Sequence, residues 1–516
     1  MKFTVILTSL LIVLSASNAS GYNILGVFHT TGKSHYILAV ALMKGLAEAG
    51  HNVTMVSPFK LDVPVKNMRE IVLDLPPAHK FSKLLYHQSQ TKIFEQLETV
   101  LQFGLNFTDD ALMDPSFQEL LKSGEKFDVA IVELFLSEAL LGIGKVFDAP
   151  MIGFCSFGAS KWSTDLNGSP SPLSYVPHTQ FTFTDRMTFL QRMANTMLSI
   201  FEKVYLDINY NYRQEALYNK HFTDPKPDFD YLKRTSLSMV LLNAHFSMNY
   251  PRPYLPNMVE IGGFHIKNKP KPLPKDLQEF LDTSPNGVIY FSMGSNLKSA
   301  DLPTEARDAL LRVFGRLNVR VMWKWEDDTL PGKPENVLIR KWFPQDDILA
   351  HPKVRFFITH GGLLSTTEAT YHGVPVLGIP VFGDQMMNMG KTQAAGYGVT
   401  VGFTNLTEES ISWAINELLS NDKYSIRAKT ISARFRDQPE DPLSRAVYWI
   451  EYVARHGGAK HLISGGQELS FIQYHNLDVF AVLLAVPILF LMLICRLLKR
   501  LFKKKSSNVG IDKKYK

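Results

Sequence analysis

Short, almost continuously apolar stretches alternate with helical stretches along most of the chain, and this alternation limits the folds available to it. The stretch YNILGVF (22–28) is followed by the loop HTTGKS, the helix-like HYILAVALMKGLAEAG and a second apolar stretch, HNVTMVSP. Ser34 is a candidate N-cap of that helix, and Gly50 is a candidate stop. Strands that are apolar on both faces are typical of a parallel sheet covered by helices, so the pattern predicts an α/β domain.

The same pattern continues through residues 21–267 and returns over 288–440. FDVAIVE and APMIGFCS extend the first half, and GVIYFSMGSN, VRVMWKWE, VRFFITHGG and GVPVLGIPVFGDQ build the second. Residues 268–287 begin with alternating Lys and Pro and are expected to form an extended linker. A chain of 516 residues is too long to fold around a single hydrophobic core. We therefore expect two doubly wound Rossmann-like domains that face each other across a cleft, with ligands at the carboxyl ends of their strands.

Two more helical stretches lie outside these repeats. Residues 180–222 are rich in Met, Phe and Tyr; they either line an apolar cleft or pack between helices, and the sequence leaves both interpretations open. Residues 441–476 begin with a helix that leads away from the second half, back towards the first, and then approach a membrane segment.

The two ends of the chain differ from the middle. Residues 1–20 carry one lysine, an apolar stretch and then small residues, which is typical of a secretory signal peptide. Residues 477–496 contain seventeen uncharged residues in a row, enough to cross a thin membrane, and a basic tail follows over 497–516. This order predicts a single-pass type I protein with a lumenal body and a cytosolic tail. Lys513 and Lys514 resemble a dilysine retrieval signal, which indicates the endoplasmic reticulum membrane.

The charge and the cysteines exclude other classes. The net charge is +6, and residues 496–516 alone contribute nine Lys or Arg and one Asp, so the basic excess is a membrane-topology signal and not a nucleic-acid surface. Cys155 and Cys495 are the only cysteines, which argues against an internal disulfide. Four Asn-X-Ser/Thr triplets occur; Asn106 and Asn405 are the better glycosylation candidates, followed by Asn52, which is expected to open a strand, and Asn167.

The stretch ITHGGLLSTTEA (358–369) combines glycines, a histidine and a glutamate between a strand and a helix. Gly361 and Gly362 let backbone N–H groups approach an anion at the helix start, and His360 can add a hydrogen bond. Glu368 could accept hydrogen bonds from two vicinal hydroxyls. It could equally complete a capping box with Ser365, and this window alone does not separate the two interpretations.

The wider spacing from Trp342 to Gln385 resembles the signature of the UDP-glycosyltransferases, which include the membrane-bound UDP-glucuronosyltransferases of animals. The signature runs W-x-x-Q, then H-G-G, then E, then D-Q. The resemblance extends over nearly the whole chain and implies the GT-B arrangement of two domains. The GGLLSTTEA wording looks like that of insect members. Leu364 stands where vertebrate members commonly have an asparagine phosphate ligand, so here that contact can come only from the backbone.

The resemblance also implies a role for each residue of the signature. Trp342 would stack on uracil and Gln345 would bind the base or the ribose. The N–H groups that follow Gly361 and Gly362 would hold the diphosphate with His360, Ser295 and Ser365. Glu368 would bind the ribose hydroxyls, and Asp384 and Gln385 the transferred sugar.

The family reaction transfers a sugar from UDP to a hydroxyl of a small lipophilic acceptor with inversion, which requires a base. KSHYILA matches the family's N-terminal motif and makes His35 the candidate base, placed at a helix start that disfavours its protonation. Glu133 stands where vertebrate relatives have an Asp that orients the base, and its arm is one methylene longer. Asp128 is a weaker alternative because it opens the strand.

We expect neither a metal nor a cofactor. Asp228 and Asp230 form an Asp-x-Asp pattern of the kind that binds a metal–diphosphate complex, but they lie outside both nucleotide motifs. The expected partners are a UDP-sugar donor, either UDP-glucose or UDP-glucuronic acid, a small lipophilic acceptor and a membrane. The sequence leaves the oligomeric state open, and a homo- or hetero-oligomer is possible. Two rival hypotheses are a transferase that acts on a membrane lipid such as ceramide and a non-catalytic nucleotide-sugar binder.

Overall fold

The computed structural model describes residues 21–88, 91, 93–223, 226–267 and 269–511. The chain forms two units, a body that ends at Ile463 and a C-terminal segment that begins at Ser464, and each is described by itself. The expected signal peptide and the dilysine Lys513–Lys514 lie outside the described residues.

The first half of the body, here called the N-lobe, is built on a seven-stranded, entirely parallel sheet of order β3-β2-β1-β4-β5-β6-β7. Its strands are β1 Asn23–Val27, β2 Asn52–Ser57, β3 Met68–Val72, β4 Val129–Glu133, β5 Met151–Cys155, β6 Leu237–Leu242 and β7 Met258–Glu260. The order reverses between β1 and β4, and an open parallel sheet binds ligands at such a switch point.

Helices connect these strands. They are α2 Lys33–Glu48, η1 Ala78–Phe81, α3 Ser82–Gln88, α4 Ile93–Met113, α5 Pro115–Lys122, η2 Glu138–Gly142, α6 Ile143–Val146, α7 Lys161–Asn167, α8 Phe189–Tyr205, the π-helical turn η3 Leu206–Tyr210, α9 Asn211–His221 and α10 Phe229–Thr235. The two faces of the sheet pack into separate buried clusters, one around Leu25 and Val132 and the other around Ile24 and Ile131, because neighbouring side chains on a strand point to opposite faces.

The second half, the C-lobe, carries a six-stranded parallel sheet of order β10-β9-β8-β11-β12-β13. Its strands are β8 Val288–Ser292, β9 Arg320–Lys324, β10 Val337–Arg340, β11 Val354–Thr359, β12 Val376–Gly378 and β13 Gly398–Thr400. Its helices are α11 Lys275–Asp282, η4 Ser299–Asp301, α12 Thr304–Gly315, α13 Gln345–Leu349, α14 Leu363–His372, α15 Gln385–Ala394, η5 Phe403–Asn405, α16 Glu408–Ser420 and α17 Lys423–Arg436. The prediction of two doubly wound domains is confirmed, and the switch point of this sheet lies between β8 and β11.

The prediction of an extended linker over 268–287 is wrong for its second part. Residues 275–282 form α11, and Leu277 and Leu281 are fully buried in the C-lobe core. Their i, i+4 spacing places both leucines on one helical face, and burial of that face outweighs the Lys-Pro composition that precedes it.

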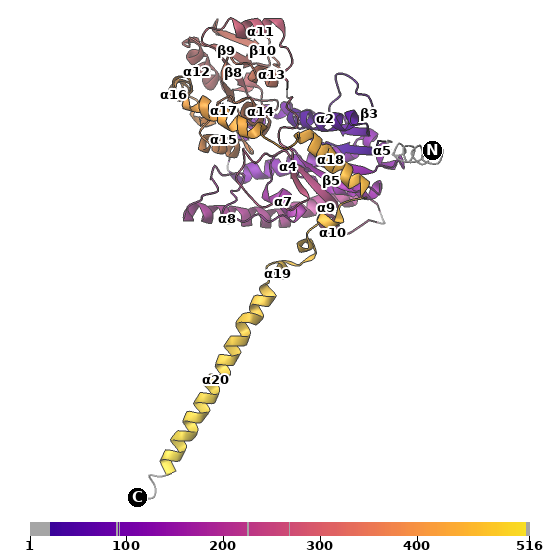
Figure 1. Cartoon of the computed structure of the whole chain (residues 1–516), viewed down its shortest axis with the longest axis vertical. Coiled ribbons are helices and arrows are strands. Elements are labelled where there is room, and N and C mark those ends of the chain that lie inside the picture. The colour runs from indigo at the N-terminus through magenta and orange to yellow at the C-terminus, as the bar shows by residue number, and fades with distance from the viewer. Residues whose placement is uncertain (1–20, 89–90, 92, 224–225, 268, 512–516) are drawn as a thin grey trace, which may run out of the picture. The chain divides into compact units, whose positions relative to one another are not determined.

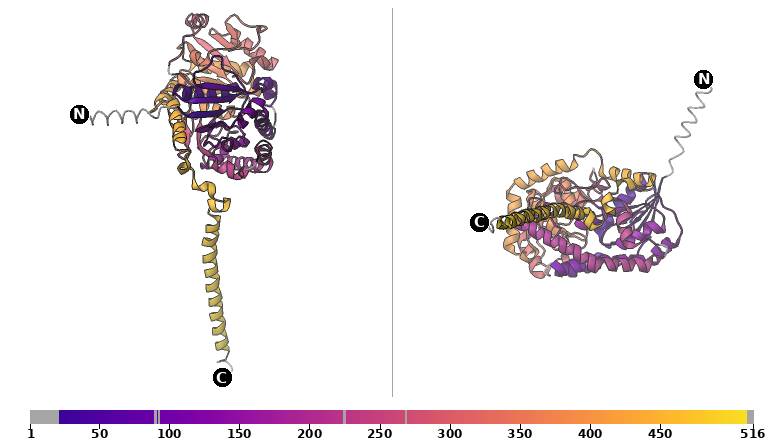
Figure 2. Two further views of the ribbon diagram at one scale, coloured as in Figure 1. Left: turned by 90° about the vertical axis from the view of Figure 1, so that its right-hand side faces the viewer. Right: turned by 90° about the horizontal axis from the view of Figure 1, so that it is seen from below.

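Helix α18, Pro442–Arg455, packs on the N-lobe although it follows the C-lobe in the chain, and it runs along the body in Figures 1 and 2. Ala446, Ile450 and Val453 are fully buried with the N-lobe cluster that contains Ile24. The short turn η6, Lys460–Leu462, then contacts β6 at the end of the body.

The C-terminal segment contains η7 Gly465–Glu468, α19 Phe471–Tyr474 and α20 Leu477–Ile511. Within α20, the span Leu477–Phe502 contains an 18-residue stretch with a mean hydropathy of 2.8, and among the described residues this is the one helix long and apolar enough to cross a membrane. The helix does not end near Arg496 as expected. Leu, Lys and Arg are good helix formers, so the change from apolar to basic residues does not stop it.

Candidate functional site

A cavity of about 500 Å³ lies where the strands of both lobes end. The N-lobe contributes residues that follow β1, β4 and β5, among them His35 and Ser156, and the C-lobe contributes residues that follow β8, β10 and β11, among them Ser295, Trp342 and His360. Carboxyl ends of parallel strands meet at one edge of a sheet, so each lobe presents its loops to this cavity.

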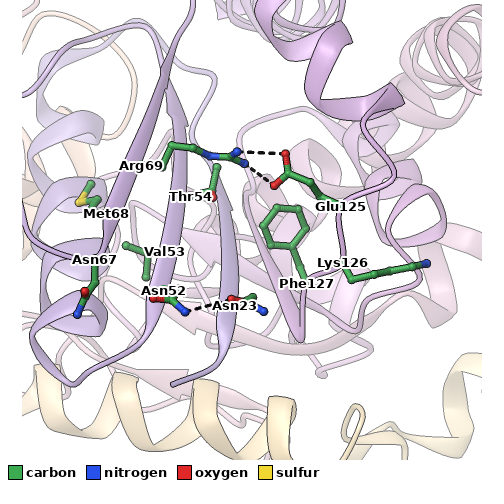
Figure 3. A pocket seen from close by; sticks show the side chains of 10 residues that line it. All are labelled: Asn23, Asn52, Val53, Thr54, Asn67, Met68, Arg69, Glu125, Lys126 and Phe127. Carbon is green, nitrogen blue, oxygen red and sulfur yellow. Dashed lines mark hydrogen bonds and ion pairs between the residues drawn. The ribbon is translucent and has the colours of Figure 1, made fainter. Parts of the chain in front are cut away.

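A second cavity, of about 480 Å³, lies at the opposite edge of the N-lobe sheet, where β1, β2 and β3 begin (Figure 3). Arg69 and Glu125 pair across it through two hydrogen bonds, of 3.1 and 2.7 Å. Asp128, the weaker alternative to Glu133, also lies at this edge, because its Oδ2 accepts a hydrogen bond of 2.7 Å from the backbone N–H of Asn23. Asp128 is therefore remote from His35, as its place at the strand start predicted.

The structure brings His35 and Glu133 into contact. Helix α2 places His35 in its first turn, β4 ends at Glu133, and the His35 Nδ1 to Glu133 Oε1 distance is 2.5 Å. Ser34 is not the N-cap of α2; the helix begins at Lys33, two residues earlier than a cap at Ser34 would place it, and its N-cap is Gly32, which makes no side-chain hydrogen bond. The longer arm of Glu133, compared with Asp, still reaches the ring.

Two hydroxyls complete this dyad, and sequence reasoning missed both. Thr30 Oγ1 donates to Glu133 Oε2 at 2.6 Å, and Ser156 Oγ lies 2.9 Å from His35 Nδ1. Burial alone would raise the pKa of the Glu133 carboxyl, but the His35 ring, His29 and Thr30 together lower it below its usual value. Glu133 is therefore ionised and can accept a hydrogen bond from Nδ1–H of His35; in that tautomer the lone pair of the ring is on Nε2.

The ring of His360 packs between the backbones of Gly294 and Gly362 on the C-lobe side of the cavity. An added Cβ at Gly294 would stand 2.4 Å from His360 Cε1, and one at Gly362 would stand 2.5 Å from His360 Nε2. Both glycines are required because the ring packs directly on their backbones. Burial, with a smaller contribution from Lys324, lowers the pKa of His360 to about 4, so its ring is neutral near pH 7 and offers a hydrogen bond without formal charge.

The capping-box interpretation of Ser365 and Glu368 is wrong. Helix α14 begins at Leu363, its N-cap is Gly362, and no side chain caps it. Glu368 is buried one turn further along, and its Oε2 accepts a hydrogen bond of 2.6 Å from Gln345 Nε2, which also donates to Ser365 Oγ at 3.1 Å. Burial raises the pKa of Glu368 to about 8. This carboxyl faces the cavity and is not used by its own helix.

Trp342 carries two lysines near its ring. The Nζ atoms of Lys33, from the N-lobe, and Lys324, at the end of β9, lie 4.5 and 5.7 Å from the ring centroid. The indole is half exposed and lines the cavity. Lys324 also pairs with Glu326 at 2.6 Å, so part of its charge is neutralised.

Asp384 and Gln385 begin helix α15 at the cavity wall. Asp384 Oδ2 accepts a hydrogen bond of 2.8 Å from Asn388, and burial raises the pKa of Asp384. Gln385 Oε1 accepts hydrogen bonds from the backbone N–H groups of Val381 and Phe382 at 2.8 and 3.1 Å, which fixes the loop that precedes the helix. The amide nitrogen of Gln385 stays available to a ligand.

His265 is a further residue that the sequence did not indicate. It belongs to the N-lobe but reaches Glu368 of the C-lobe, with Nε2 3.8 Å from Glu368 Oε1, and its side chain is only 4% exposed. Burial lowers the pKa of His265 to about 4. No local pattern could have identified it, because the contact depends on how the two lobes meet.

The N-lobe side of the cavity is apolar. Leu97, Val100 and Leu101 of α4 line it with Phe135, and the His35 ring packs edge-on against Phe135 at 5.2 Å between centroids. An adjoining pocket with largely aromatic walls extends from His35; it is lined by Phe81, Leu85, Phe103, Phe107 and Phe382, among others. Such walls suit a lipophilic molecule held next to the imidazole.

The Asp-x-Asp pattern lies elsewhere and has local partners. Asp228 caps α10 by accepting the N–H of Tyr231, and Asp230 pairs with Lys233. Within the described parts of the chain, no group of three or more His, Cys, Asp or Glu side chains could hold a metal ion. Both cysteines are free, as the sequence predicted.

The glycosylation candidates differ in exposure. Asn106 on α4, Asn405 in η5 and Asn52 are exposed, whereas Asn167 at the end of α7 is buried. Asn52 opens β2, as expected.

These features define a class of protein: a GT-B glycosyltransferase, in which two Rossmann-like lobes enclose the site. The solved structure of CalG4, the calicheamicin glycosyltransferase, shows the same fold, with a TM-score of 0.54 and 18% identity over 84% of this chain and 99% of that chain. The family described as "UDP-glucoronosyl and UDP-glucosyl transferase" matches residues 11–514.

Relatives of similar length agree with this match. The chain is 38% identical to the UDP-glycosyltransferase UGT5 of Dactylopius coccus over 93% of this chain and 92% of that protein. It is 31% identical to the human UDP-glucuronosyltransferase 2A2 over 94% and 93% of the two chains. The chain belongs to the UDP-glycosyltransferase family, whose members transfer a sugar from a UDP-sugar.

Proposed function

We propose that this enzyme transfers a neutral hexose, glucose first, from its UDP-sugar to the hydroxyl of a small lipophilic acceptor, with inversion at the anomeric carbon. The observation that carries the proposal is that His35, in contact with the buried Glu133, lines the same cavity that Glu368 and His360 of the C-lobe line. A base on one wall and a nucleotide pocket on the other are the requirements of a single displacement.

In the proposed reaction, His35 Nε2 takes the proton of the acceptor hydroxyl. The acceptor oxygen forms a bond to the anomeric carbon, the bond from that carbon to the β-phosphate oxygen breaks, and UDP leaves with the electron pair. Glu133 stabilises the imidazolium that forms, as a carboxylate does when it holds Nδ1–H. The neutral His360, Ser295 and the N–H groups at the start of α14 bind the diphosphate, and Lys324 supplies positive charge nearby.

The choice of a neutral hexose rests on the cations in the cavity. Its described lining contains no arginine, and its two lysines are Lys267 and Lys324. A uronate carboxylate is best recognised by the bidentate fork of an arginine. The buried Asp384, with Gln385, suits the hydroxyls of a hexose.

A donor panel tests the proposal. Full-length enzyme in microsomes is given a simple phenol with UDP-glucose, UDP-galactose or UDP-glucuronic acid, and UDP release is measured. We expect kcat/KM for UDP-glucose to exceed that for UDP-glucuronic acid by at least about 10-fold, the scale of one lost charge-assisted hydrogen bond. A preference for UDP-glucuronic acid would overturn the donor assignment. If none of these donors releases UDP with any of a range of phenols, the result would favour the non-catalytic binder.

Glu368 gives a second test, through pH. Below about pH 8 its carboxyl is largely protonated in the free enzyme. Ribose hydroxyls donate to the ionised form, so bound UDP lowers this pKa, and UDP affinity should rise as the pH increases from 6 towards 8. Glu368→Gln should weaken UDP binding by roughly 10- to 100-fold at pH 8 and remove this rise. The titration of UDP itself affects the unmodified enzyme and Glu368→Gln equally. If the UDP affinities of the two proteins, measured by calorimetry, change with pH in parallel, Glu368 is excluded as a ribose ligand.

We also infer that the enzyme is anchored in the endoplasmic reticulum membrane with its body in the lumen. The apolar helix Leu477–Phe502 and the basic residues at its end support this orientation. Asn106 and Asn405 are exposed, and glycans attached to them would indicate that the body lies in the lumen.

A further inference from the structure

One carboxylate interrupts the apolar N-lobe wall of the cavity. Aliphatic and aromatic side chains such as Leu97, Phe135 and Phe157 form this wall, and Glu202 of α8 lies among them. Glu202 is the one acidic side chain that the described part of the N-lobe contributes to the lining of this cavity. A carboxylate placed among apolar side chains loses part of its hydration, so its position is favourable only when a polar partner compensates it.

His178 binds one of the two carboxylate oxygens. Its Nε2 lies 3.1 Å from Glu202 Oε2, and its side chain is only 4% exposed. The backbone N–H of Gln180 donates to His178 Nδ1 at 3.2 Å. Because a backbone N–H can only donate, Nδ1 carries no proton and the ring proton is on Nε2. His178 is therefore a neutral donor that fixes the carboxylate and leaves its charge uncompensated.

The other oxygen has no partner within the described residues. Glu202 Oε1 accepts no hydrogen bond there, and no described Lys or Arg lies within ion-pair distance of the carboxylate. The lysines of the pocket that adjoins the cavity at Glu202 each pair with an aspartate: Lys161 with Asp165 at 2.8 Å, Lys203 with Asp207 at 3.1 Å and Lys233 with Asp230 at 2.8 Å. Glu202 is therefore able to accept a cation from a ligand.

Aromatic rings accompany this carboxylate. Trp162 lines the cavity and the adjoining pocket together with Glu202, and its ring centroid is 6.4 Å from that of Phe157. The Nε1–H group of Trp162 donates to Glu138 Oε1, so it is not available to a ligand and the ring offers its π-system. A carboxylate next to aromatic rings is an arrangement that binds an ammonium group, through a charge-assisted hydrogen bond and cation–π attraction.

We propose that Glu202 binds an ammonium group of the acceptor, so that this enzyme prefers lipophilic alcohols or phenols that carry a protonated amine at a distance from the reacting hydroxyl. The inference rests on the proposed function, which places that hydroxyl at His35. His35 and Glu202 line one cavity of about 500 Å³, a size that holds a small organic molecule. The ammonium group donates to Oε1, the carbon chain contacts the apolar wall, and the two contacts together orient the hydroxyl towards the base. The protonated nitrogen has no lone pair, so transfer occurs at oxygen.

An acceptor panel tests the substrate class. Full-length enzyme in microsomes is given its best UDP-sugar with 4-(ω-aminoalkyl)phenols of increasing chain length, each compared with the 4-alkylphenol of equal length. We expect kcat/KM for the aminoalkylphenol to exceed that for its partner by about 10-fold or more at one chain length, the scale of one charge-assisted hydrogen bond. Equal values, or a preference for the 4-alkylphenol at every length, would overturn the inference.

The variant Glu202→Gln tests the residue. The amide has the same size and its oxygen can still accept the hydrogen bond of His178, but the charge is lost. We expect the ratio of kcat/KM for the preferred aminoalkylphenol to that for its alkyl partner to fall about 10-fold. The matched control Glu215→Gln removes the same charge from an exposed position of α9 outside the cavity lining and should leave the ratio unchanged.

A structural role of Glu202 would give a different result. In that case Glu202→Gln would lower the rates with both acceptors equally and leave their ratio unchanged, which would overturn the inference. Failure of the proposed function is also distinguishable, because the unmodified enzyme would then not transfer a sugar to the 4-alkylphenols either.

Discussion

Replacement of His35 by Ala is expected to lower kcat by about 10²- to 10⁴-fold while the affinity for UDP stays the same. The reason is that His35 stands on the N-lobe wall with its Nδ1 held by Glu133, so only Nε2 can accept the proton of the acceptor hydroxyl. The residues proposed to bind the nucleotide belong to the C-lobe, and loss of the imidazole should leave them in place. Transfer to phenol and calorimetric titration with UDP measure the two quantities separately.

The matched control is His360→Ala, a histidine on the opposite wall. This variant should weaken UDP binding and lower the rate because less donor is bound. His35→Ala, in contrast, should lower kcat and leave the UDP affinity unchanged. Joint loss of UDP affinity and transfer in His35→Ala would show that His35 supports the structure and would remove it as the base.

Glu133→Gln is expected to lower kcat by about 100-fold or more with little change in the fold. The amide has nearly the same shape and can still accept the hydrogen bond of Thr30, but its NH₂ group would donate to Nδ1 of His35. That donation moves the ring proton to Nε2 and blocks the base, and the charge that stabilises the imidazolium is also lost. Rates measured across pH at saturating donor check this prediction.

Glu133→Asp serves as the companion variant. It keeps the charge but shortens the arm, so its activity should lie between those of the unmodified enzyme and Glu133→Gln. A rate for Glu133→Gln equal to that of the unmodified enzyme would remove Glu133 from the dyad.

Much of this architecture could be predicted from the sequence because its signals are local. Apolar strands followed by helices predict parallel sheets, and residues just after strands must gather at one edge. The family resemblance assigned His35, Trp342 and His360 to one site with Glu133 beside His35. The structure brings the three rings to one cavity, and Glu133 is buried in contact with His35.

The errors arose where two local signals competed. Ser365 and Glu368 have the spacing of a capping box, but the helix begins at Leu363, which places Ser365 inside it. The Lys-Pro stretch before α11 suggested a linker, although Leu277 and Leu281 already carried the spacing of a buried helical face. In both cases the position of the helix start decided the outcome, and sequence patterns define helix boundaries poorly.

Other features depend on tertiary contacts and could not be predicted. The ring of His265 approaches Glu368 only because the lobes meet, and Ser156 approaches His35 only because β5 lies beside β4. The periodicity of α8 predicts an amphipathic helix but not which face is buried. The face that carries Asn195 is the buried one, because Asn195 accepts a hydrogen bond from the backbone N–H of His178.

The stereochemistry of the product shows whether the sugar is transferred in a single displacement. When the α-linked donor UDP-glucose reacts with phenol, proton NMR of the isolated glucoside gives the configuration from the coupling constant of the anomeric proton. With the base on one wall and the departing UDP on the other, the acceptor attacks the anomeric carbon from the face opposite to UDP, so we expect the β-glucoside. An α-glucoside would contradict a single displacement assisted by His35.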